Sequence, residues 1–157
     1  MRKAVYLIIL CSLLLLPVLM GQATSLETKV GIDSSSNLSF AFQAEADVSS
    51  SMSIAFVVET SLAGIGATQT SSTSIGLRGK WYLASKDAQF VPYLGFGGHM
   101  KMEGTTTTYL IETFAGARVN LTPNVYLLGE GAIFIPIAEP TAYYWKFYTG
   151  LGFVLRF

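Results

Sequence analysis

The chain ends at residues 143–157 with the stretch YYWKFYTGLGFVLRF, which decides the fold. Its odd positions are apolar or aromatic apart from Thr149, whereas its even positions include Lys146, Arg156 and two glycines. A period of two is typical of a β-strand whose two faces meet different environments. The stretch therefore predicts a strand with one apolar face and one face that carries the charges.

The same alternation recurs upstream. We expect earlier strands over residues 26–33, 38–48, 52–61, 73–83, 90–102, 109–121 and 125–135. Residues that favour turns separate these runs, among them Asn37, Asp87, Gly104 and Pro123. Eight strands of about ten residues joined by short turns predict an antiparallel up-and-down meander. Closing the meander into a barrel removes its two exposed edges.

The N-terminal region has the layout of a secretory signal peptide. Two basic residues precede an apolar run over residues 4–20, and Ala23 completes a small-x-small cleavage site. An uncleaved anchor helix is the alternative, because the run is nearly long enough to span a bilayer. Pro17 and the small residues stand where a cleavage region is expected. We therefore predict a signal peptide over residues 1–23 and one barrel domain over residues 24–157.

Composition excludes several classes of function. The chain holds ten acidic and ten basic residues, a balance that does not attract nucleic acid. Charged residues make up 13% of the chain, against about 25% in a typical soluble domain. The single cysteine lies in the predicted signal peptide, so we expect no disulfides or thiol chemistry in the mature chain. The sequence has no Cys/His cluster and no spaced acidic loop that would predict a metal site, and we expect no cofactor.

Alternation alone does not say which face of the barrel is outside. A soluble, lipocalin-like barrel would turn the apolar face inward, whereas a membrane barrel turns it to lipid. The polar face has only one or two charges per strand, too few for a surface in water. Its small residues, such as Gly95 and Gly116, suit the narrow lumen of an eight-stranded barrel. Both observations favour the membrane barrel.

Aromatic residues on the apolar face predict two membrane-interface girdles. If the N-terminus is periplasmic, Trp81 ends its strand at the periplasmic rim, where Phe157 joins it. Trp145 begins the last strand at the outer rim, together with Tyr109 and Tyr143. We therefore predict an all-β fold: an eight-stranded antiparallel up-and-down transmembrane β-barrel, preceded by a cleaved signal peptide.

The mature chain resembles the small eight-stranded outer-membrane barrels of the OmpA/OmpX type. The resemblance rests on the meander, the run FVPYLGFG at residues 90–97 and the final aromatic residue. It implies a porin-like protein of the outer membrane, secreted through the inner membrane, with outer-membrane lipid and the barrel insertion machinery as partners. We expect a monomer. In that family the last strand carries the insertion signal, which implies an assembly signal at Leu151, Phe153, Leu155 and Phe157.

With this orientation the polar face fills the lumen with nearly balanced charges. Those expected to form a structural ion network are Glu45, Glu59, Arg78, Lys80, Lys101, Glu112, Arg118, Glu130, Lys146 and Arg156. Because buried charges need partners, we expect Glu59 beside Arg78, and Glu130 near Lys146 or Arg118. The network predicts a plugged lumen. The alternative is a narrow, low-conductance pore through rearranging pairs.

A lipid-modifying enzyme and an adhesin are further alternatives. The only histidine, His99, has no serine within five residues, although a serine from another strand or loop, such as Ser71 or Ser72, would provide a nucleophile. We expect His99 to face the lumen and pair with an acid such as Glu112, and we predict no catalytic residues and no enzyme. The loops expected outside, at residues 34–37, 63–72, 103–107 and 137–142, are short for an adhesin. The sequence predicts a structural or interaction role in the cell envelope.

Overall fold

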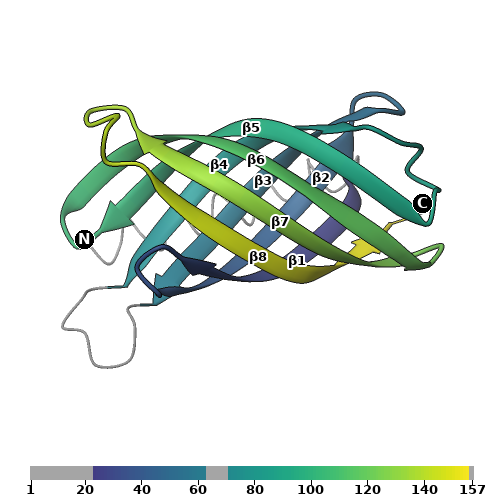
Figure 1. Cartoon of the computed structure of the whole chain (residues 1–157), viewed down its shortest axis with the longest axis horizontal. Helices are drawn as coiled ribbons and strands as arrows, with labels where there is room; N and C mark the ends of the chain where they lie inside the picture. The colour runs from purple at the N-terminus through teal and green to yellow at the C-terminus, as the bar shows by residue number, and fades with distance from the viewer. Residues whose placement is uncertain (1–22, 63–70, 156–157) are drawn as a thin grey trace.

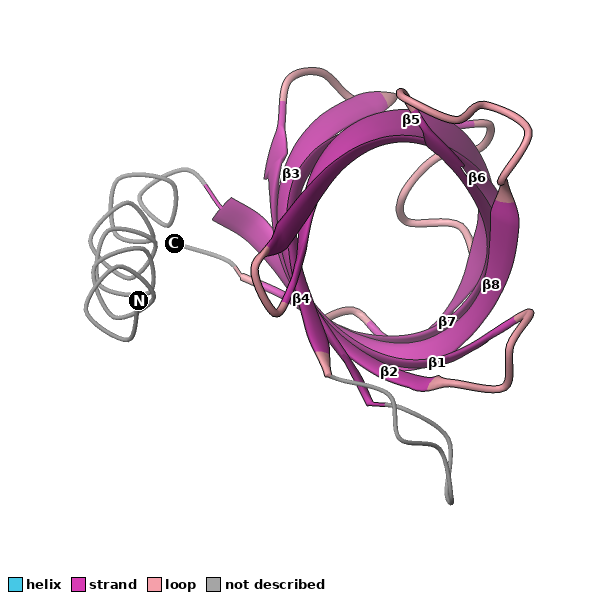
Figure 2. Cartoon of the chain, turned by 90° about the vertical axis from the view of Figure 1, so that its left-hand side faces the viewer, coloured by secondary structure: helices cyan, strands magenta, loops and turns pink. Residues whose placement is uncertain are grey.

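The computed structural model describes residues 23–62 and 71–155 as a closed barrel of eight antiparallel strands. The strands are β1 (Ala23–Asp33), β2 (Leu38–Asp47), β3 (Met52–Leu62), β4 (Ser72–Tyr82), β5 (Phe90–Glu103), β6 (Thr106–Thr122), β7 (Val125–Pro136) and β8 (Tyr144–Val154). Each pairs with the next in the chain, and β8 pairs with β1. Strands cross the long axis obliquely (Figure 1) and form a complete ring in end view (Figure 2). The predicted eight-stranded barrel is confirmed.

The predicted signal peptide lies almost entirely outside the described residues. Of the predicted signal peptide, only Ala23 lies within the described residues, where it begins β1. Among the residues that the structure describes, no helix is long and apolar enough to cross a membrane.

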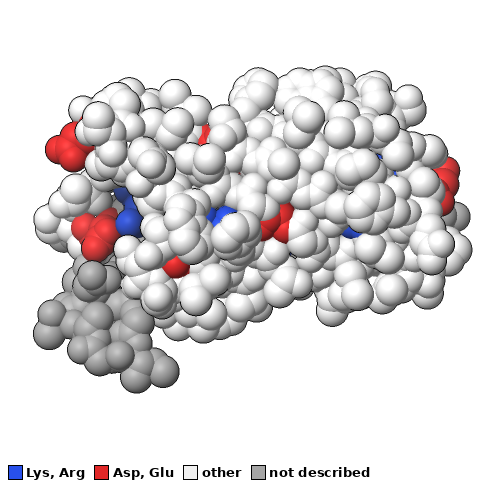
Figure 3. Space-filling view, in the orientation of Figure 1, with Lys and Arg blue, Asp and Glu red and all other residues white. Residues whose placement is uncertain are grey.

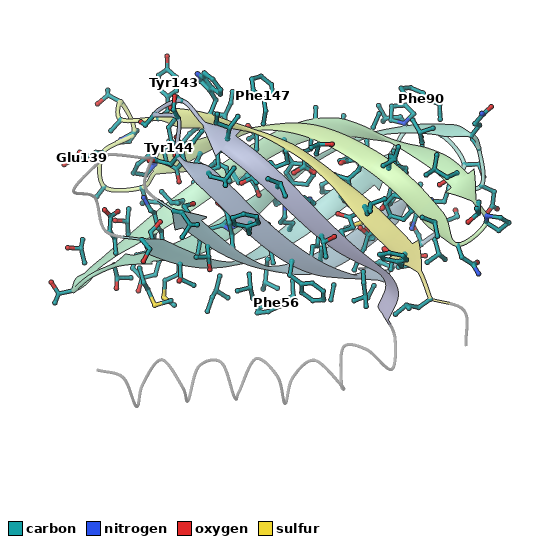
Figure 4. All side chains as sticks on the ribbon, turned by 90° about the horizontal axis from the view of Figure 1, so that it is seen from below. Phe56, Phe90, Glu139, Tyr143, Tyr144 and Phe147 are labelled. Atoms are coloured by element: carbon teal, nitrogen blue, oxygen red, sulfur yellow. The ribbon has the colours of Figure 1, made fainter. Side chains whose placement is uncertain are left out.

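The alternation of the sequence becomes the two faces of the barrel wall. In β8, Trp145 and Phe147 are 43% and 59% exposed, whereas Lys146 and Tyr148 are 5% and 7% exposed. Phe147 and, at the other end of the barrel, Phe90 point away from the ribbon in Figure 4. The surface shown in Figure 3 is mostly uncharged, and its acidic atoms are most prominent at the two ends. The large apolar side chains therefore cover the outside.

The two ends of the barrel carry different connections. The end that we call the terminal mouth carries the start of β1, the end of β8 and the connections at residues 48–51, 83–89 and 123–124. The opposite end, the loop mouth, carries the β1–β2, β3–β4, β5–β6 and β7–β8 connections. These two mouths are the routes by which a solute would reach the lumen.

One predicted loop at the loop mouth is shorter than expected. Residues 103–107 were expected as a loop, yet Thr106 pairs with Glu103 and Thr107 with Met102, so β6 starts at Thr106. Two features favour this hairpin: Gly104 adopts a φ of 58°, which glycine tolerates in a tight turn, and β-branched threonines suit a strand. The predicted loop of residues 103–107 is therefore wrong, because tertiary pairing extends the hairpin.

Small residues on the lumen face make room for large ones. A Cβ atom on Gly116 would lie 2.7 Å from the hydroxyl of Tyr93 and 2.5 Å from the carbonyl oxygen of Gly129. Real Cβ atoms do not approach other atoms so closely, so an alanine at this position would displace the tyrosine or the neighbouring strand. The glycines of the lumen face thus allow the barrel interior to be filled with aromatic and charged side chains.

Candidate functional site in the barrel lumen

The middle of the lumen is filled by a connected group of polar side chains, which we call the lumen plug. Its members come from β1, β2, β4, β6 and β7 and are at most 4% exposed. They are Glu27, Lys29, Gln43, Glu45, Arg78, Lys80, Glu112 and Glu130. Because their partners are one another, the plug lowers the cost of keeping charge away from water.

Arg78 lies at the centre of the plug. Its guanidinium nitrogens lie 2.6 Å from Glu130 and 2.9 Å from Glu112, and one of them donates to the amide oxygen of Gln43 at 2.9 Å. The guanidinium group also stacks over the ring of Phe114, 3.6 Å from its centroid. A planar guanidinium suits this arrangement, since it presents several donors in fixed directions and a face for an aromatic ring.

The two lysines of the plug bridge the remaining acids. Lys80 lies 2.8 Å from Glu27 and 2.7 Å from Glu45, and Lys29 lies 3.3 Å from both Glu27 and Glu130. Carboxylate lone pairs left over by these contacts are taken up by tyrosine hydroxyls. The hydroxyl donors to Glu45, Glu130 and Glu27 are Tyr82, Tyr93 and Tyr126, respectively. The plug is thus bonded to the barrel wall as well as within itself.

Nearer the loop mouth, an ion pair outside the lumen plug joins Lys146 to Glu59. Tyr148 donates to Glu59 at 2.8 Å, and Lys146 also donates to the hydroxyls of Ser39 and Ser61 at 3.3 and 3.2 Å. The expected pairing of Glu59 with Arg78 is wrong. Glu59 stands opposite Ser74 on β4, four residues and about 13 Å from Arg78 along the strand.

The partners expected for Glu130 are also wrong. Glu130 pairs with Arg78 and Lys29, and neither Lys146 nor Arg118 forms an ion pair with it. The expectation assumed partners on neighbouring strands. In a narrow closed barrel the lumen side chains point toward the axis, so Glu130 on β7 meets Arg78 on β4.

His99 lies between an acid and a serine. Its Nε2 is 2.8 Å from Glu112, the expected partner, and its Nδ1 is 3.2 Å from the hydroxyl of Ser74, a serine that the sequence did not single out. A serine, a histidine and an acid in this order can activate a nucleophile. Here all three are buried, Arg78 holds the acid, and the adjoining cavity of about 10 Å³ has room for about one water molecule. On the lumen side the arrangement therefore leaves no space for a lipid or sugar substrate. His99 also lines an apolar groove of about 640 Å³, together with residues such as Met100 and Tyr109.

Both mouths open into polar cavities. The terminal vestibule, at the terminal mouth, has a volume of about 870 Å³ and is lined by side chains that include Ser25, Asp47, Lys86, Arg118 and Asn120. The loop vestibule, at the loop mouth, has a volume of about 290 Å³ and is lined by side chains that include Asp33, Ser61, Lys101, Tyr144 and Lys146. The lumen plug lies between the two, so in this conformation they do not form one passage.

The other predicted site residues lie along the barrel ends. Tyr109, Tyr143 and Trp145 are exposed at the loop mouth, and Figure 4 shows Tyr143 pointing outward there. Trp81 lies near the terminal mouth, with its ring 5.3 Å from that of Phe96.

The remaining predicted residues have mixed outcomes. Lys101 is partly exposed and lies 3.2 Å from Glu103. In the predicted assembly signal, Leu151 and Phe153 are exposed on the outer face, and Leu155 follows the end of β8. Arg156 and Phe157 lie outside the described residues.

Sequence reasoning assigned no role to the tyrosines that bind the plug. The signal was available, because Tyr82, Tyr93 and Tyr126 occupy the same alternating positions as the lumen charges. Alternation gives the face of the wall on which a residue lies. The acid that each hydroxyl contacts depends on strand stagger and barrel radius, which appear only in three dimensions.

Comparisons with known proteins identify the fold. No protein-family model matches the sequence, and no curated protein matches it. Among solved structures, the N-terminal β-barrel domain of Pseudomonas aeruginosa OprF aligns with a TM-score of 0.72 and 10% identity, covering 85% of this chain and 98% of that one. Neisserial surface protein A aligns with a TM-score of 0.65 and 15% identity, covering 84% and 96%. The outer membrane enzyme PagL aligns with a TM-score of 0.55 and 10% identity, covering 83% and 99%. At such identities the likeness shows the fold alone: the chain has the fold of the small eight-stranded outer-membrane barrels, the OmpA/OmpX type.

Proposed function

We propose that this protein is an integral outer-membrane barrel with a closed lumen and a structural or interaction role in the cell envelope. The observation that carries the proposal is the combination of an apolar outside with an ion-paired inside. Leu77, Phe96 and Phe147 are each about 60% exposed on the outer face, whereas Lys80 and Glu112 are buried in the lumen. A soluble barrel would have the opposite distribution, and so much exposed apolar surface requires a lipid partner.

The proposal includes an orientation. Two of the three connections at the terminal mouth, residues 48–51 and 123–124, are short turns, which fits the periplasmic side of such barrels. The loop mouth then faces the cell exterior. Trp81 at one end and Trp145 at the other fit the two interfaces of the bilayer. The chain would reach this membrane through the insertion machinery, guided by its last strand, and would act there as a monomer.

Solubility and gel mobility test the membrane assignment. The protein should be extracted from cell envelopes only with detergent. On gels its mobility should change after heating, because the folded barrel resists the detergent until heated. Recovery of the mature protein in the soluble fraction without detergent would contradict the proposal.

The pore remains the second candidate, because vestibules of about 870 and 290 Å³ approach the plug from both ends. Planar-bilayer recording on refolded protein separates the two functions. The plugged barrel should be silent, whereas discrete conductance steps would establish the pore. A variant with Arg78→Ser, which shortens a central plug side chain, tests whether any current passes through the lumen, since its steps should then be larger.

The proposal assigns no chemistry to the protein. PagL is an outer membrane enzyme, but Ser74, His99 and Glu112 are buried in the lumen, where the adjoining cavity is about 10 Å³. The groove of about 640 Å³ that His99 also lines is mostly apolar. Refolded protein mixed with labelled phospholipid or lipopolysaccharide should release no product. Turnover that disappears in both Ser74→Ala and His99→Ala variants would overturn this part of the proposal.

A further inference from the structure

Arg118 is a buried cation that pairs with no acid in the described part of the chain. It lies on β6 near the terminal mouth and is 5% exposed. A terminal nitrogen of its side chain donates a hydrogen bond to the carbonyl oxygen of Lys86 at 2.6 Å. No carboxylate of residues 23–62 and 71–155 forms an ion pair with it, whereas Arg78, Lys80 and the other buried cations of that part have one. An unpaired buried charge is costly, which makes this residue unusual.

The unsatisfied atom of Arg118 is Nε. Some other buried polar atoms also lack a well-oriented hydrogen bond, but Glu27 Oε2 lies 3.3 Å from Lys29 and Arg78 Nε lies 2.9 Å from Glu112. Within the described part of the chain, Nε of Arg118 has neither a hydrogen bond nor an ion pair. A buried N–H without an acceptor favours any ligand that supplies one.

Two tyrosines hold the guanidinium group in place. The rings of Tyr82 and Tyr126 lie 5.1 and 4.8 Å from its central carbon. These contacts compensate part of the lost hydration, and they restrict the side chain to one position. The tyrosine rings provide no hydrogen-bond acceptor for Nε, however. The group is therefore prepared for an anion, and no acid among residues 23–62 and 71–155 neutralises it.

Arg118 lines the terminal vestibule, whose volume of about 870 Å³ falls in the range of small-molecule sites. Its other lining groups are hydrogen-bonding side chains such as Ser85, Gln89 and Asn120. Asn120 holds the β4–β5 connection by donating to the carbonyl oxygens of Lys86 and Ala88 at 2.8 and 2.6 Å. The vestibule thus combines a fixed cation with a polar wall.

The surrounding charges limit the ligand to one negative charge. Among the described lining residues the other cation is Lys86, which is paired with Asp47, while Glu45 is paired with Lys80. Asp87 adds an exposed acid at the rim. Arg118 is therefore the vestibule cation that no described acid pairs with, and a second anionic group on a ligand would face nearby acids. A planar carboxylate matches the fork of a guanidinium group.

We propose that Arg118 binds the carboxylate of a small monoanionic ligand in the terminal vestibule. Such a carboxylate comes either from a free organic acid or from the C-terminus of a peptide. The site depends on the barrel geometry and not on the membrane in which the barrel lies, so its failure would leave the proposed function unaffected.

Nuclear magnetic resonance of the arginine Nε–H groups tests the site in refolded full-length mature protein in detergent micelles. The Arg118→Gln variant assigns the Arg118 resonance. Added N-acetylalanine should shift this resonance until saturation, and its neutral methyl ester should not. Inorganic phosphate should bind more weakly. If acetate binds as tightly as N-acetylalanine, the ligand is a free organic acid. If acetate binds more weakly, the ligand is the C-terminus of a peptide.

Variants at the two mouths provide the controls. Arg118→Gln should weaken N-acetylalanine binding, followed by amide resonances of the vestibule, about tenfold or more, as expected for loss of a hydrogen bond to a charged group. Arg118→Lys, which keeps the charge without the planar fork, should weaken it less. Lys101→Gln removes a cation from the opposite mouth and should leave binding unchanged. The proposal is overturned if the ester shifts the resonance equally, if phosphate binds more tightly, or if Lys101→Gln weakens binding as much as Arg118→Gln. Heat-modifiable gel mobility verifies that each variant is folded.

Discussion

A guanidinium nitrogen of Arg78 on β4 lies 2.6 Å from a carboxylate oxygen of Glu130 on β7, directly across the lumen. Both side chains are nearly inaccessible to solvent. A charge in such a position that loses its partner cannot be solvated by water. This contact therefore makes the plug the part of the barrel that is most sensitive to neutral substitutions.

Replacing Glu130 by Gln should lower the free energy of unfolding by about 3–5 kcal/mol, the usual cost of breaking a buried pair. Urea unfolding of refolded protein in micelles measures the change. Glu103→Gln is the matched control: it alters the partly exposed pair with Lys101 and should cost less than about 1 kcal/mol. Equal effects of the two substitutions would show that the plug contributes no more than a surface pair.

Two glycines of opposite faces should respond differently to alanine. A Cβ atom on Gly150, which faces the lumen, would lie 2.9 Å from Cα of Lys29, a backbone atom that cannot move aside freely. Gly98, which faces outward, has open space at the same position. Gly150→Ala should destabilise the barrel by about 1–3 kcal/mol, and Gly98→Ala should be neutral or stabilise it by up to about 1 kcal/mol. Urea unfolding in micelles measures both changes. A larger loss of stability for Gly98→Ala than for Gly150→Ala would show that the face assigned to the lumen lies outside.

The cost of a charge on the outer face should depend on depth. Leu77 is the middle residue of β4, whereas Phe153 is the penultimate residue of β8, near the end of the barrel. Leu77→Arg should cost about 2–4 kcal/mol and Phe153→Arg about 0–1 kcal/mol, because the penalty falls from the bilayer midplane to its surface. Unfolding in phospholipid vesicles measures both, and Leu77→Met serves as the apolar control. A harmless Leu77→Arg would be incompatible with a lipid-facing outer surface.

The two tryptophans should both lie at shallow depth in the bilayer. Trp81→Phe and Trp145→Phe each leave a single tryptophan whose fluorescence reports one end of the barrel. Lipids brominated near the headgroup should quench both emissions more strongly than lipids brominated near the chain ends, as expected for interfacial girdles. Strong quenching of either residue by the deep probe would rule out its place in a girdle.

How far the sequence predicts this molecule depends on the length scale. Alternation identified all eight strands and the inward and outward faces of residues such as Lys146 and Trp145, because a period of two is a local property. The start of β6 was missed, because the pairing of Thr106 with Glu103 depends on the partner strand. Local pattern therefore defined the wall of the barrel and left its ends uncertain by a few residues.

The lumen contacts were less accessible to sequence reasoning. The pairing of His99 with Glu112 was expected and is present, and these residues lie on adjacent strands. The partners of Glu59 and Glu130 were wrong, since each pairs with a residue on a strand that is not its neighbour. Contacts across a closed ring depend on strand stagger, a property of the whole barrel.

The ion pairs of the plug, which connect strands across the barrel, have a consequence for assembly. Glu130 on β7 relies on Arg78 on β4 and Lys29 on β1, so its partners come together only when the first and last strands have joined. An open sheet of the same eight strands would hold these charges apart and hydrated. The ion pairs therefore favour the closed ring over partly assembled sheets, and they make ring closure the step at which the lumen loses its water.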